Sequence, residues 1–149
     1  MFPAQPKCKY VQKYLYGKAI VADIGCGVGI ETDFIQSLGA FVVGVDIDFD
    51  LLKIAKNHLP NENTQLLAGD AHHLPFREKA FCVVVMFDVL EHLNDPLQVL
   101  THISIILKDE GILILGVPNK YTFGETLQTI TSPFRSANEK QALVECSSC

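Results

Sequence analysis

The glycine-rich segment at residues 21–29, Val-Ala-Asp-Ile-Gly-Cys-Gly-Val-Gly, constrains the fold more than any other part of the chain. Its apolar first half predicts a buried strand, and Gly25, Gly27 and Gly29 follow at alternate positions just before a predicted helix. Glycine permits positive φ angles and close approach of a ligand to the backbone, and the start of a helix offers free N–H groups. The segment therefore predicts a ligand-binding loop at the carboxyl end of a parallel strand.

The rest of the chain alternates short β-branched runs with segments of helical period, which is typical of a parallel sheet covered by helices. Asp50 is a candidate N-cap for the helix after the second strand, and Asp95 followed by Pro96 is a candidate cap for the last long helix. The pattern predicts an α/β fold with a three-layer, doubly wound parallel sheet. The predicted strands are residues 19–24, 41–46, 64–67, 81–87 and 111–117, and the predicted helices are residues 7–16, 30–38, 51–57 and 96–107.

Length and composition limit the class of protein. With 149 residues, we expect one domain spanning residues 1–149, with a core at 19–119 and a weakly structured segment at 120–149. The net charge of −5 and the loose spacing of the basic residues do not favour a nucleic acid as partner. Because the sequence has no apolar run of 18 residues and no apolar leader, we expect a cytoplasmic protein without a membrane span.

The cysteines and histidines do not predict a metal site. The five cysteines are an odd number, and Cys26 and Cys82 fall in a tight loop and a predicted strand, so we expect reduced thiols. The C-terminal Cys-x-x-Cys at residues 146–149 has no second ligand pair. His72 and His73 are adjacent and point to opposite sides of an extended segment, so we interpret them as polar loop residues.

A carboxylate follows the second predicted strand and indicates the kind of ligand. Asp46 lies where it can accept hydrogen bonds from both hydroxyls of a ribose, which indicates an adenosine-type ligand. NAD enzymes share this acid, but the GxGxG spacing differs from the GxGxxG expected for a pyrophosphate. Asp23, two residues before the first glycine, would repel a pyrophosphate and suits an ammonium group. A cationic ligand is therefore favoured.

Two further motifs follow the third and fourth strands. Asp70 and Ala71 offer a side-chain acceptor and a backbone N–H that can read an adenine edge. The segment at residues 74–76, Leu-Pro-Phe, then supplies apolar cover. The segment at 87–93, Phe-Asp-Val-Leu-Glu-His-Leu, leaves the fourth strand at the switch point of the sheet, where such folds bind ligands.

With these motifs in order, VADIGCGVG, GVDID, GDAHHLPF and FDVLEHLNDP, residues 19–119 resemble the class I, Rossmann-like S-adenosylmethionine-dependent methyltransferases. Within that family they are similar to the ubiquinone and menaquinone biosynthesis methyltransferases. The resemblance implies S-adenosyl-L-methionine as the cofactor. The implied contacts are Asp23 near the amino group, Gly25, Cys26, Gly27 and Gly29 along the methionine portion, Asp46 on the ribose, Ile47 on the adenine face, Asp70 and Ala71 on the adenine edge, and Phe87 at the methionine end.

The resemblance also implies a strand order of 3-2-1-4-5-7-6, with a C-terminal antiparallel hairpin. After Val117 we find no two further strand patterns, so we expect the order 3-2-1-4-5 without the hairpin, and at most short helices at 121–130 and 136–149. The fifth strand would then be an apolar open edge, which natural proteins normally cover. We expect either the C-terminal segment or a second copy, in a homodimer, to cover it.

Methyl transfer needs positioning and, for some acceptors, a base, for which His92 is the first candidate and Glu91 the second. The fourth strand lacks the Asn/Asp-Pro-Pro-Tyr/Phe motif of amine-methylating enzymes, so a small or lipophilic acceptor methylated on carbon or oxygen is favoured. The function predicted first is that of a methyltransferase. The alternatives are a non-catalytic S-adenosylmethionine-binding scaffold or regulatory subunit, a truncated methyltransferase and, third, an NAD-dependent oxidoreductase.

Overall fold

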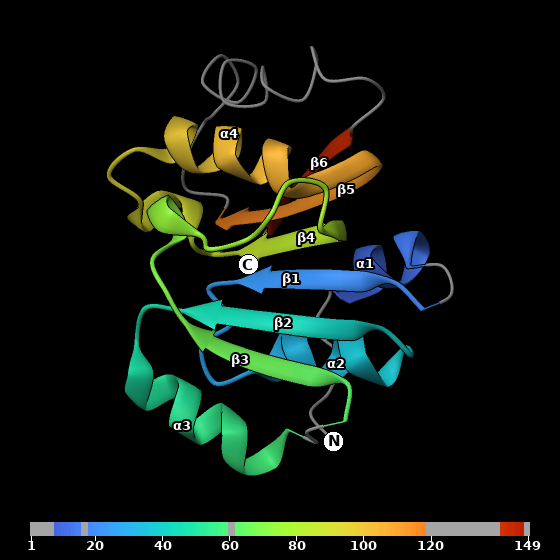
Figure 1. Ribbon diagram of the computed structural model, residues 1–149, viewed down its shortest axis with the longest axis vertical. Helices are drawn as coiled ribbons and strands as arrows, with labels where there is room; N and C mark the ends of the chain where they lie inside the picture. The colour runs from blue at the N-terminus through green and yellow to red at the C-terminus, as the bar shows by residue number, and fades with distance from the viewer. Residues whose placement is uncertain (1–7, 16–17, 60–61, 119–140, 148–149) are drawn as a thin grey trace.

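A parallel β-sheet forms the centre of the computed structural model, and helices cover it (Figure 1). The structure describes residues 8–15, 18–59, 62–118 and 141–147. The strand order is β3-β2-β1-β4-β5-β6, so the predicted order 3-2-1-4-5 is confirmed and a sixth strand is added. Every pair of neighbouring strands is parallel. The strands are β1 (Ile20–Ile24), β2 (Phe41–Asp46), β3 (Thr64–Ala68), β4 (Phe81–Phe87), β5 (Leu107–Pro118) and β6 (Gln141–Ser147).

The four α-helices agree with the predictions to within two residues at every end. Asp95 caps the last long helix, since its side chain accepts a hydrogen bond from the N–H of Gln98 at 3.0 Å, and Pro96 is the first helical residue. Between β3 and β4 only a single 3₁₀ turn forms, and another follows β4. The helical elements are α1 (Cys8–Tyr14), α2 (Ile30–Ser37), α3 (Phe49–His58), α4 (Pro96–Ile106), η1 (Ala71–His73) and η2 (Leu90–His92).

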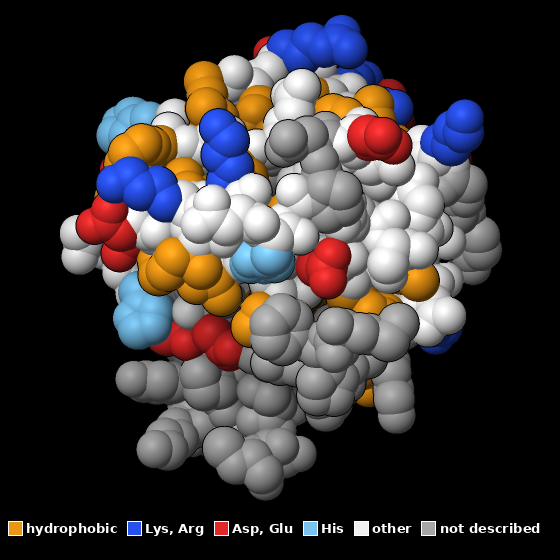
Figure 2. Space-filling view, turned by 90° about the horizontal axis from the view of Figure 1, so that it is seen from below, with side chains coloured by type: hydrophobic (Ala, Val, Ile, Leu, Met, Phe, Trp, Pro, Cys, Tyr) orange, Lys and Arg blue, Asp and Glu red, His pale blue; other side chains and the backbone are white. Residues whose placement is uncertain are grey.

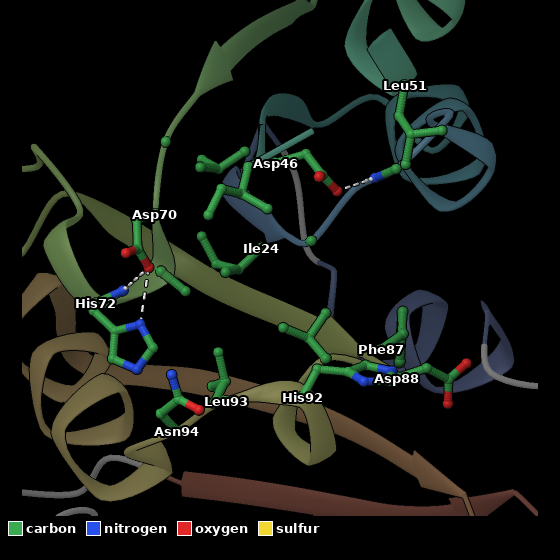
Figure 3. A pocket seen from close by; sticks show the side chains of 17 residues that line it. Ile24, Asp46, Leu51, Asp70, His72, Phe87, Asp88, His92, Leu93 and Asn94 are labelled. Carbon is green, nitrogen blue, oxygen red and sulfur yellow. Dashed lines mark hydrogen bonds and ion pairs between the residues drawn. The ribbon is translucent and has the colours of Figure 1, made fainter. Parts of the chain in front are cut away.

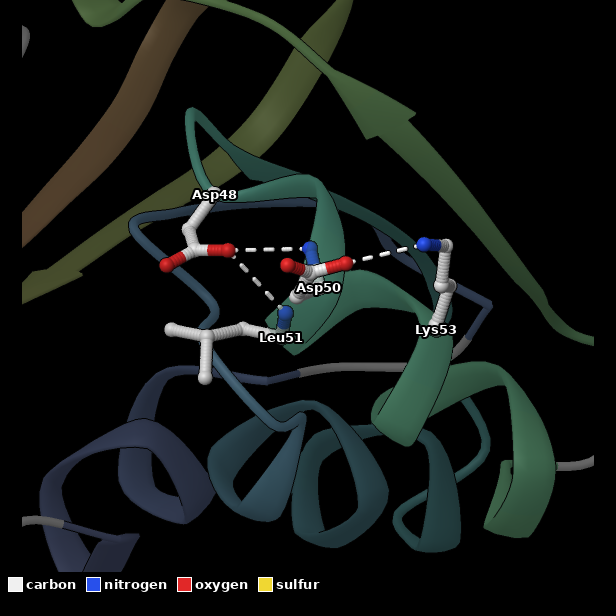
Figure 4. A network of polar contacts seen from close by, with 4 residues as sticks. All are labelled: Asp48, Asp50, Leu51 and Lys53. Carbon is white, nitrogen blue, oxygen red and sulfur yellow. Dashed lines mark hydrogen bonds and ion pairs between the residues drawn. The ribbon is translucent and has the colours of Figure 1, made fainter.

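The predicted cap of α3 is wrong, because the helix begins two residues earlier than the apolar pattern suggests. Asp48 is the N-cap, and its side chain accepts hydrogen bonds from the N–H groups of Asp50 at 2.9 Å and Leu51 at 3.3 Å (Figure 4). Asp50 instead pairs with Lys53 at 2.8 Å. Phe49 is mostly exposed, so it does not contribute to the buried face from which the prediction started.

The core lies on both faces of the sheet. Alternate residues of β4 belong to different apolar clusters, because successive side chains of a strand point to opposite faces. Val84 and Met86 belong to a cluster with α4, whereas Val83 and Val85 belong to one that includes Val11 of α1 and residues of α2. On the face nearest α3, apolar side chains occur in small groups among charged ones (Figure 2). In the described part of the chain, no helix is long and apolar enough to cross a membrane.

β5 is not an open edge, because residues 112–118 of this strand pair with β6 over its whole length. The prediction of at most a short helix at residues 136–149 is therefore wrong, whereas the expectation that the fifth strand is covered is confirmed. Pairing with the backbone groups of an apolar edge stabilises this segment more than a short isolated helix would. Of the two solutions expected, the structure has the C-terminal segment, and nothing in it supports a homodimer through this edge. The helix predicted at 121–130 lies outside the described residues.

Asp23 is the one buried carboxylate among the described residues, with 2% of its surface exposed. Its Oδ2 accepts a hydrogen bond from the hydroxyl of Thr32 in α2 at 2.5 Å, so it connects β1 to that helix. Burial raises the pKa of Asp23 to about 7, against the opposing effect of the Thr32 hydrogen bond. The fold therefore favours the protonated acid, because the charged form loses its hydration when it is buried.

This burial predicts a pH dependence of stability. The pKa of Asp23 rises from 3.8 in the unfolded chain to about 7 in the fold, so its contribution is fully present below pH 4 and is lost as pH rises through 7. The loss amounts to roughly 4 kcal/mol at most, at about 1.4 kcal/mol per pKa unit. Asp23→Asn cannot ionise, so the free energy of unfolding of this variant, relative to the wild type, should increase between pH 5 and 8. Urea denaturation across this range measures it, and a constant difference would contradict the prediction.

The β5–β6 pairing predicts the effect of a truncation. A chain ending at residue 140 would lose β6 and leave the backbone groups of β5 without partners along an apolar strand. We expect this shortened chain to self-associate more strongly than the full chain at equal concentration. Size-exclusion chromatography with light scattering over a range of concentrations measures the association. Identical masses for the two chains would show that β6 does not protect this edge.

Candidate functional site

A cleft of about 500 Å³ opens where the carboxyl ends of the first four strands meet (Figure 3). These ends are level with one another, since Ile24 of β1 pairs with Val45 of β2, and Asp46 pairs with Ala68 of β3. The loops that leave the strands therefore converge on one edge of the sheet. Seven of the ten predicted cofactor contacts line the cleft: Gly25, Gly27, Asp46, Ile47, Asp70, Ala71 and Phe87.

The three glycines of the loop all have positive φ, as predicted, but for different physical reasons. A Cβ on Gly25 would lie 2.1 Å from Cγ2 of Val89, and one on Gly29 would lie 2.7 Å from Cδ1 of Leu59. These two glycines let neighbouring segments pack closely against the loop. At Gly27, with φ of 52°, an added Cβ would meet no atom within 4 Å, and this residue lines the cleft. Gly27 is therefore the glycine that leaves space for a ligand.

Asp46 connects this loop to β2 by a hydrogen bond. Its Oδ2 accepts from the N–H of Gly27 at 2.7 Å, and its Oδ1 accepts from the N–H of Asp48 at 2.8 Å. Both contacts fix the carboxylate at the rim of the cleft, where each oxygen keeps a further lone pair for a ligand hydroxyl. Ile47 follows with 76% of its surface exposed. An apolar side chain this exposed beside a cleft is suited to cover the flat face of a bound ring.

The segment after β3 forms the η1 turn. Asp70 is its N-cap, and its Oδ1 lies 2.9 Å from the backbone N–H and 2.8 Å from Nδ1 of His72. These two hydrogen bonds, the backbone one first, lower the pKa of Asp70, so the carboxylate is ionised at neutral pH. Both histidines lie in the connection between β3 and β4, as predicted, but in a 3₁₀ turn and not in an extended segment, and His72 lines the cleft. His73, in contrast, is exposed.

The segment after β4 forms the opposite wall. Phe87 and His92 line the cleft, as do the neighbours Asp88, Val89, Leu93 and Asn94, which had no predicted contact. Asp88 has a positive φ of 55°, a conformation that non-glycine residues rarely adopt and that is more frequent at functional sites. Of the two candidate bases, His92 borders the cleft. Glu91 does not, and its Oε2 is buried without a hydrogen-bond partner.

Three predicted contacts, Asp23, Cys26 and Gly29, do not line the cleft. Cys26 is buried, and its pKa is raised by the loss of hydration and, to a lesser degree, by the charges of Asp23 and Asp46. Its sulfur therefore stays a neutral thiol, which is not reactive. The predicted apolar cover also lies elsewhere, because Leu74 is a core residue and Phe76 packs edge-to-face on Phe81 with ring centroids 4.8 Å apart.

The charge of the cleft selects among ligands. Three carboxylates, Asp46, Asp70 and Asp88, border it, and no lysine or arginine does so among the described residues. A pyrophosphate would be repelled, whereas a ligand with a positive charge, hydroxyls and N–H donors would be attracted. No group of three or more His, Cys, Asp or Glu side chains in the described ranges is arranged to hold a metal ion.

Comparisons with known proteins agree with this geometry. Residues 22–115 match the family model described as a methyltransferase domain. The chain is 33% identical over 113 residues to a ubiquinone biosynthesis O-methyltransferase of Haemophilus ducreyi, with 71% of this chain and 48% of that protein covered. A protein of the same name from Coxiella burnetii is 30% identical over 128 residues, with 83% and 54% covered. The chain thus spans about half the length of these curated relatives.

Solved structures share the fold. The YcgJ protein of Bacillus subtilis superposes with a TM-score of 0.69 at 20% identity, with 92% of this chain and 62% of that chain covered. An S-adenosylmethionine-dependent methyltransferase of Mesorhizobium loti gives a TM-score of 0.64 at 21% identity, covering 69% and 49%. The [4+2]-cyclase SpnF gives 0.66 at 22% identity, covering 71% and 42%. From the family match, we conclude that the chain belongs to the methyltransferase domain family.

Proposed function

We propose that this chain binds S-adenosylmethionine in the cleft and transfers its methyl group to oxygen or carbon of a small-molecule acceptor. The observation that carries the proposal is the rim itself, where Gly27 leaves open space beside the fixed carboxylate of Asp46. The charges also fit, because the cofactor carries a sulfonium and an ammonium group, and among the described residues three carboxylates and no lysine or arginine border the cleft. The names of the curated relatives support oxygen as the acceptor atom.

The sheet order suggests how the cofactor lies. We place its adenine at the end of β3, between Ile47 and the Asp70–Ala71 turn, and its ribose hydroxyls on Asp46 at the end of β2. The methionine portion then extends past Gly27 toward Phe87 at the end of β4. Asp23 is too deep for direct contact, so we assign it a positioning role, through Thr32, for the helix that follows the loop.

When bound, the cofactor supplies a methyl group that is already activated by the positive sulfur. The protein therefore has to align the acceptor, exclude water and, for a hydroxyl acceptor, remove a proton. Leu93 and Val89 give the wall near His92 an apolar surface that suits a small or lipophilic molecule. We propose His92 as the base, because its imidazole borders the cleft at the end of β4. Glu91 is the weaker candidate because it does not border the cleft.

A second candidate function is binding without transfer. The observation that favours it is that the chain spans about half the length of the curated relatives, so the other half of each relative lies outside the match. A protein named as a cyclase shares this fold, so the fold alone does not determine which reaction is catalysed. Cofactor binding is common to both candidates, whereas methyl transfer separates them.

The cofactor site can be tested with a pair of glycine variants. A side chain on Gly27 would project into the cleft, so Gly27→Ala should weaken binding of S-adenosylhomocysteine at least about tenfold, a loss of about 1.4 kcal/mol. Gly39→Ala is the matched control, because Gly39 also has positive φ and open space around an added Cβ, but does not border the cleft. Isothermal titration measures both dissociation constants.

Both variants should lose a similar free energy of unfolding, about 1–2 kcal/mol, from the strained backbone. Equal binding by Gly27→Ala and Gly39→Ala would mean that the ligand lies elsewhere. No binding of S-adenosylmethionine or S-adenosylhomocysteine by the wild-type chain would contradict the proposed function as a whole.

If His92 is the base, its substitution should lower the rate of methyl transfer and leave cofactor binding unchanged. With a catechol as hydroxyl acceptor, His92→Gln should lower kcat about 100-fold or more, because it removes a base and keeps a polar side chain. The dissociation constant for S-adenosylmethionine should stay within about twofold, well under the tenfold that 1.4 kcal/mol represents. Glu91→Gln is the neighbouring control and should keep wild-type kcat. A reversal of the two results would assign the base to Glu91.

A further inference from the structure

The ring of Phe87 lies against a glycine of the neighbouring strand. Phe87 ends β4 beside Asp88 and His92, on the wall of the cleft (Figure 3). Its partner in the parallel register of β4 and β5 is Gly116. A Cβ on Gly116 would lie 2.6 Å from Cδ1, 3.4 Å from Cε1 and 3.5 Å from Cγ of the phenylalanine ring. The ring therefore occupies the place that a side chain of Gly116 would take, and it leans over β5.

The backbone of β5 does not explain why a glycine stands at this position. Gly116 is not among the glycines with positive φ, so its conformation does not require glycine. A glycine inside a strand weakens the sheet, and it often marks a place where another group approaches closely. Here that group is the ring of Phe87. The carbonyl oxygen of Gly116 also accepts a hydrogen bond from the N–H of Asp88 at 2.9 Å, which fixes the point where the chain leaves β4.

The loop that follows β1 lies on the other side of Phe87. Asp23 of β1 pairs with Val85 of β4, so Gly25, two residues later, is level with Phe87. Both Gly25 and Phe87 line the cleft. On the same face of the sheet, Val85 and Ile114 precede the ring in β4 and β5, and both are completely buried, so the ring cannot move in that direction. A ring that is displaced from β5 therefore turns toward the loop and the cleft.

We propose that Gly116 is a positioning residue for the cofactor, because it lets the ring of Phe87 lie over β5 and so keeps the cleft open between the ends of β1 and β4. This inference rests on the proposed function, which places the methionine portion in that part of the cleft. A side chain at residue 116 would turn the ring toward Gly25 and into the space of the methionine portion. Because Gly116 acts through Phe87, a more adaptable side chain at residue 87 should remove the need for the glycine. Methionine is such a side chain, since it is unbranched and fills irregular gaps.

The test is a double-mutant cycle on the full chain, with the dissociation constant of S-adenosylhomocysteine measured by isothermal titration. Gly116→Ala should weaken binding at least about tenfold, because the displaced ring takes space that the ligand needs. Phe87→Met should weaken binding about threefold, because it loses part of the ring's contact. In the Phe87→Met background, however, Gly116→Ala should change the dissociation constant by less than about twofold.

Gly111→Ala is the matched control. Gly111 lies in the same strand and is also buried, and a Cβ there would lie 2.7 Å from the carbonyl oxygen of Lys108. It does not border the cleft. This variant should lose stability in urea denaturation, as Gly116→Ala does, but should bind S-adenosylhomocysteine as the wild type does. The control therefore separates a loss of stability from a loss of ligand space.

Wild-type affinity in Gly116→Ala would overturn the proposal. So would a loss of affinity that is equally large in the Phe87→Met background, since a role that does not act through the ring gives that result. If Gly116→Ala does not fold, as judged by thermal unfolding, the double variant decides. It should fold and bind as Phe87→Met does, and a double variant that does not fold or does not bind would overturn the proposal. Failure of the wild type to bind S-adenosylhomocysteine would instead contradict the proposed function on which this inference rests.

Discussion

The hydrogen bond from the N–H of Gly27 to the carboxylate of Asp46 connects the two halves of the site, and the arrangement of the cleft depends on it. It joins the loop after β1 to the end of β2, and the same carboxylate holds the N–H of Asp48, the residue that caps α3. The Asp46 carboxylate therefore holds in place the glycine loop, the rim of the cleft and the start of the next helix. A charged acceptor with backbone donors is among the stronger hydrogen-bonding arrangements in a protein.

The sheet that positions this contact could be predicted from the sequence because its strands are buried on both faces. Runs such as those of β2 and β4 are continuously apolar, and no other element of a soluble domain needs that pattern over so short a length. The loops between them were predicted by glycines and carboxylates at strand ends, and most of those residues do border the cleft. Residues that reach the cleft because they directly follow a strand could therefore be predicted from the sequence.

Residues whose role depends on packing between distant segments were not found. The sequence cannot distinguish Asp23, which points into the core, from an acid that points into the cleft, because both follow the same strand pattern. The pairing of β6 with β5 joins residues about 30 positions apart, and no local sequence pattern predicts it. The sequence did not predict that His72 lines the cleft, because its position depends on a turn whose geometry is set by Asp70. Local propensity says little about any of these long-range choices.

The charges around the cleft restrict which ligands can bind more than the fold does. Parallel sheets of this order bind many nucleotides, and the dinucleotide sites among them meet a pyrophosphate with helix N–H groups. Here α2 begins behind the glycine loop, after the αL residue Gly29, and the exposed rim carries carboxylates instead. Such a rim stabilises a positive ligand and leaves a hydroxyl acceptor in a field that opposes its ionisation. Removal of the acceptor's proton therefore needs a base at the reacting end, and we propose the imidazole of His92, which borders the cleft there, for this role.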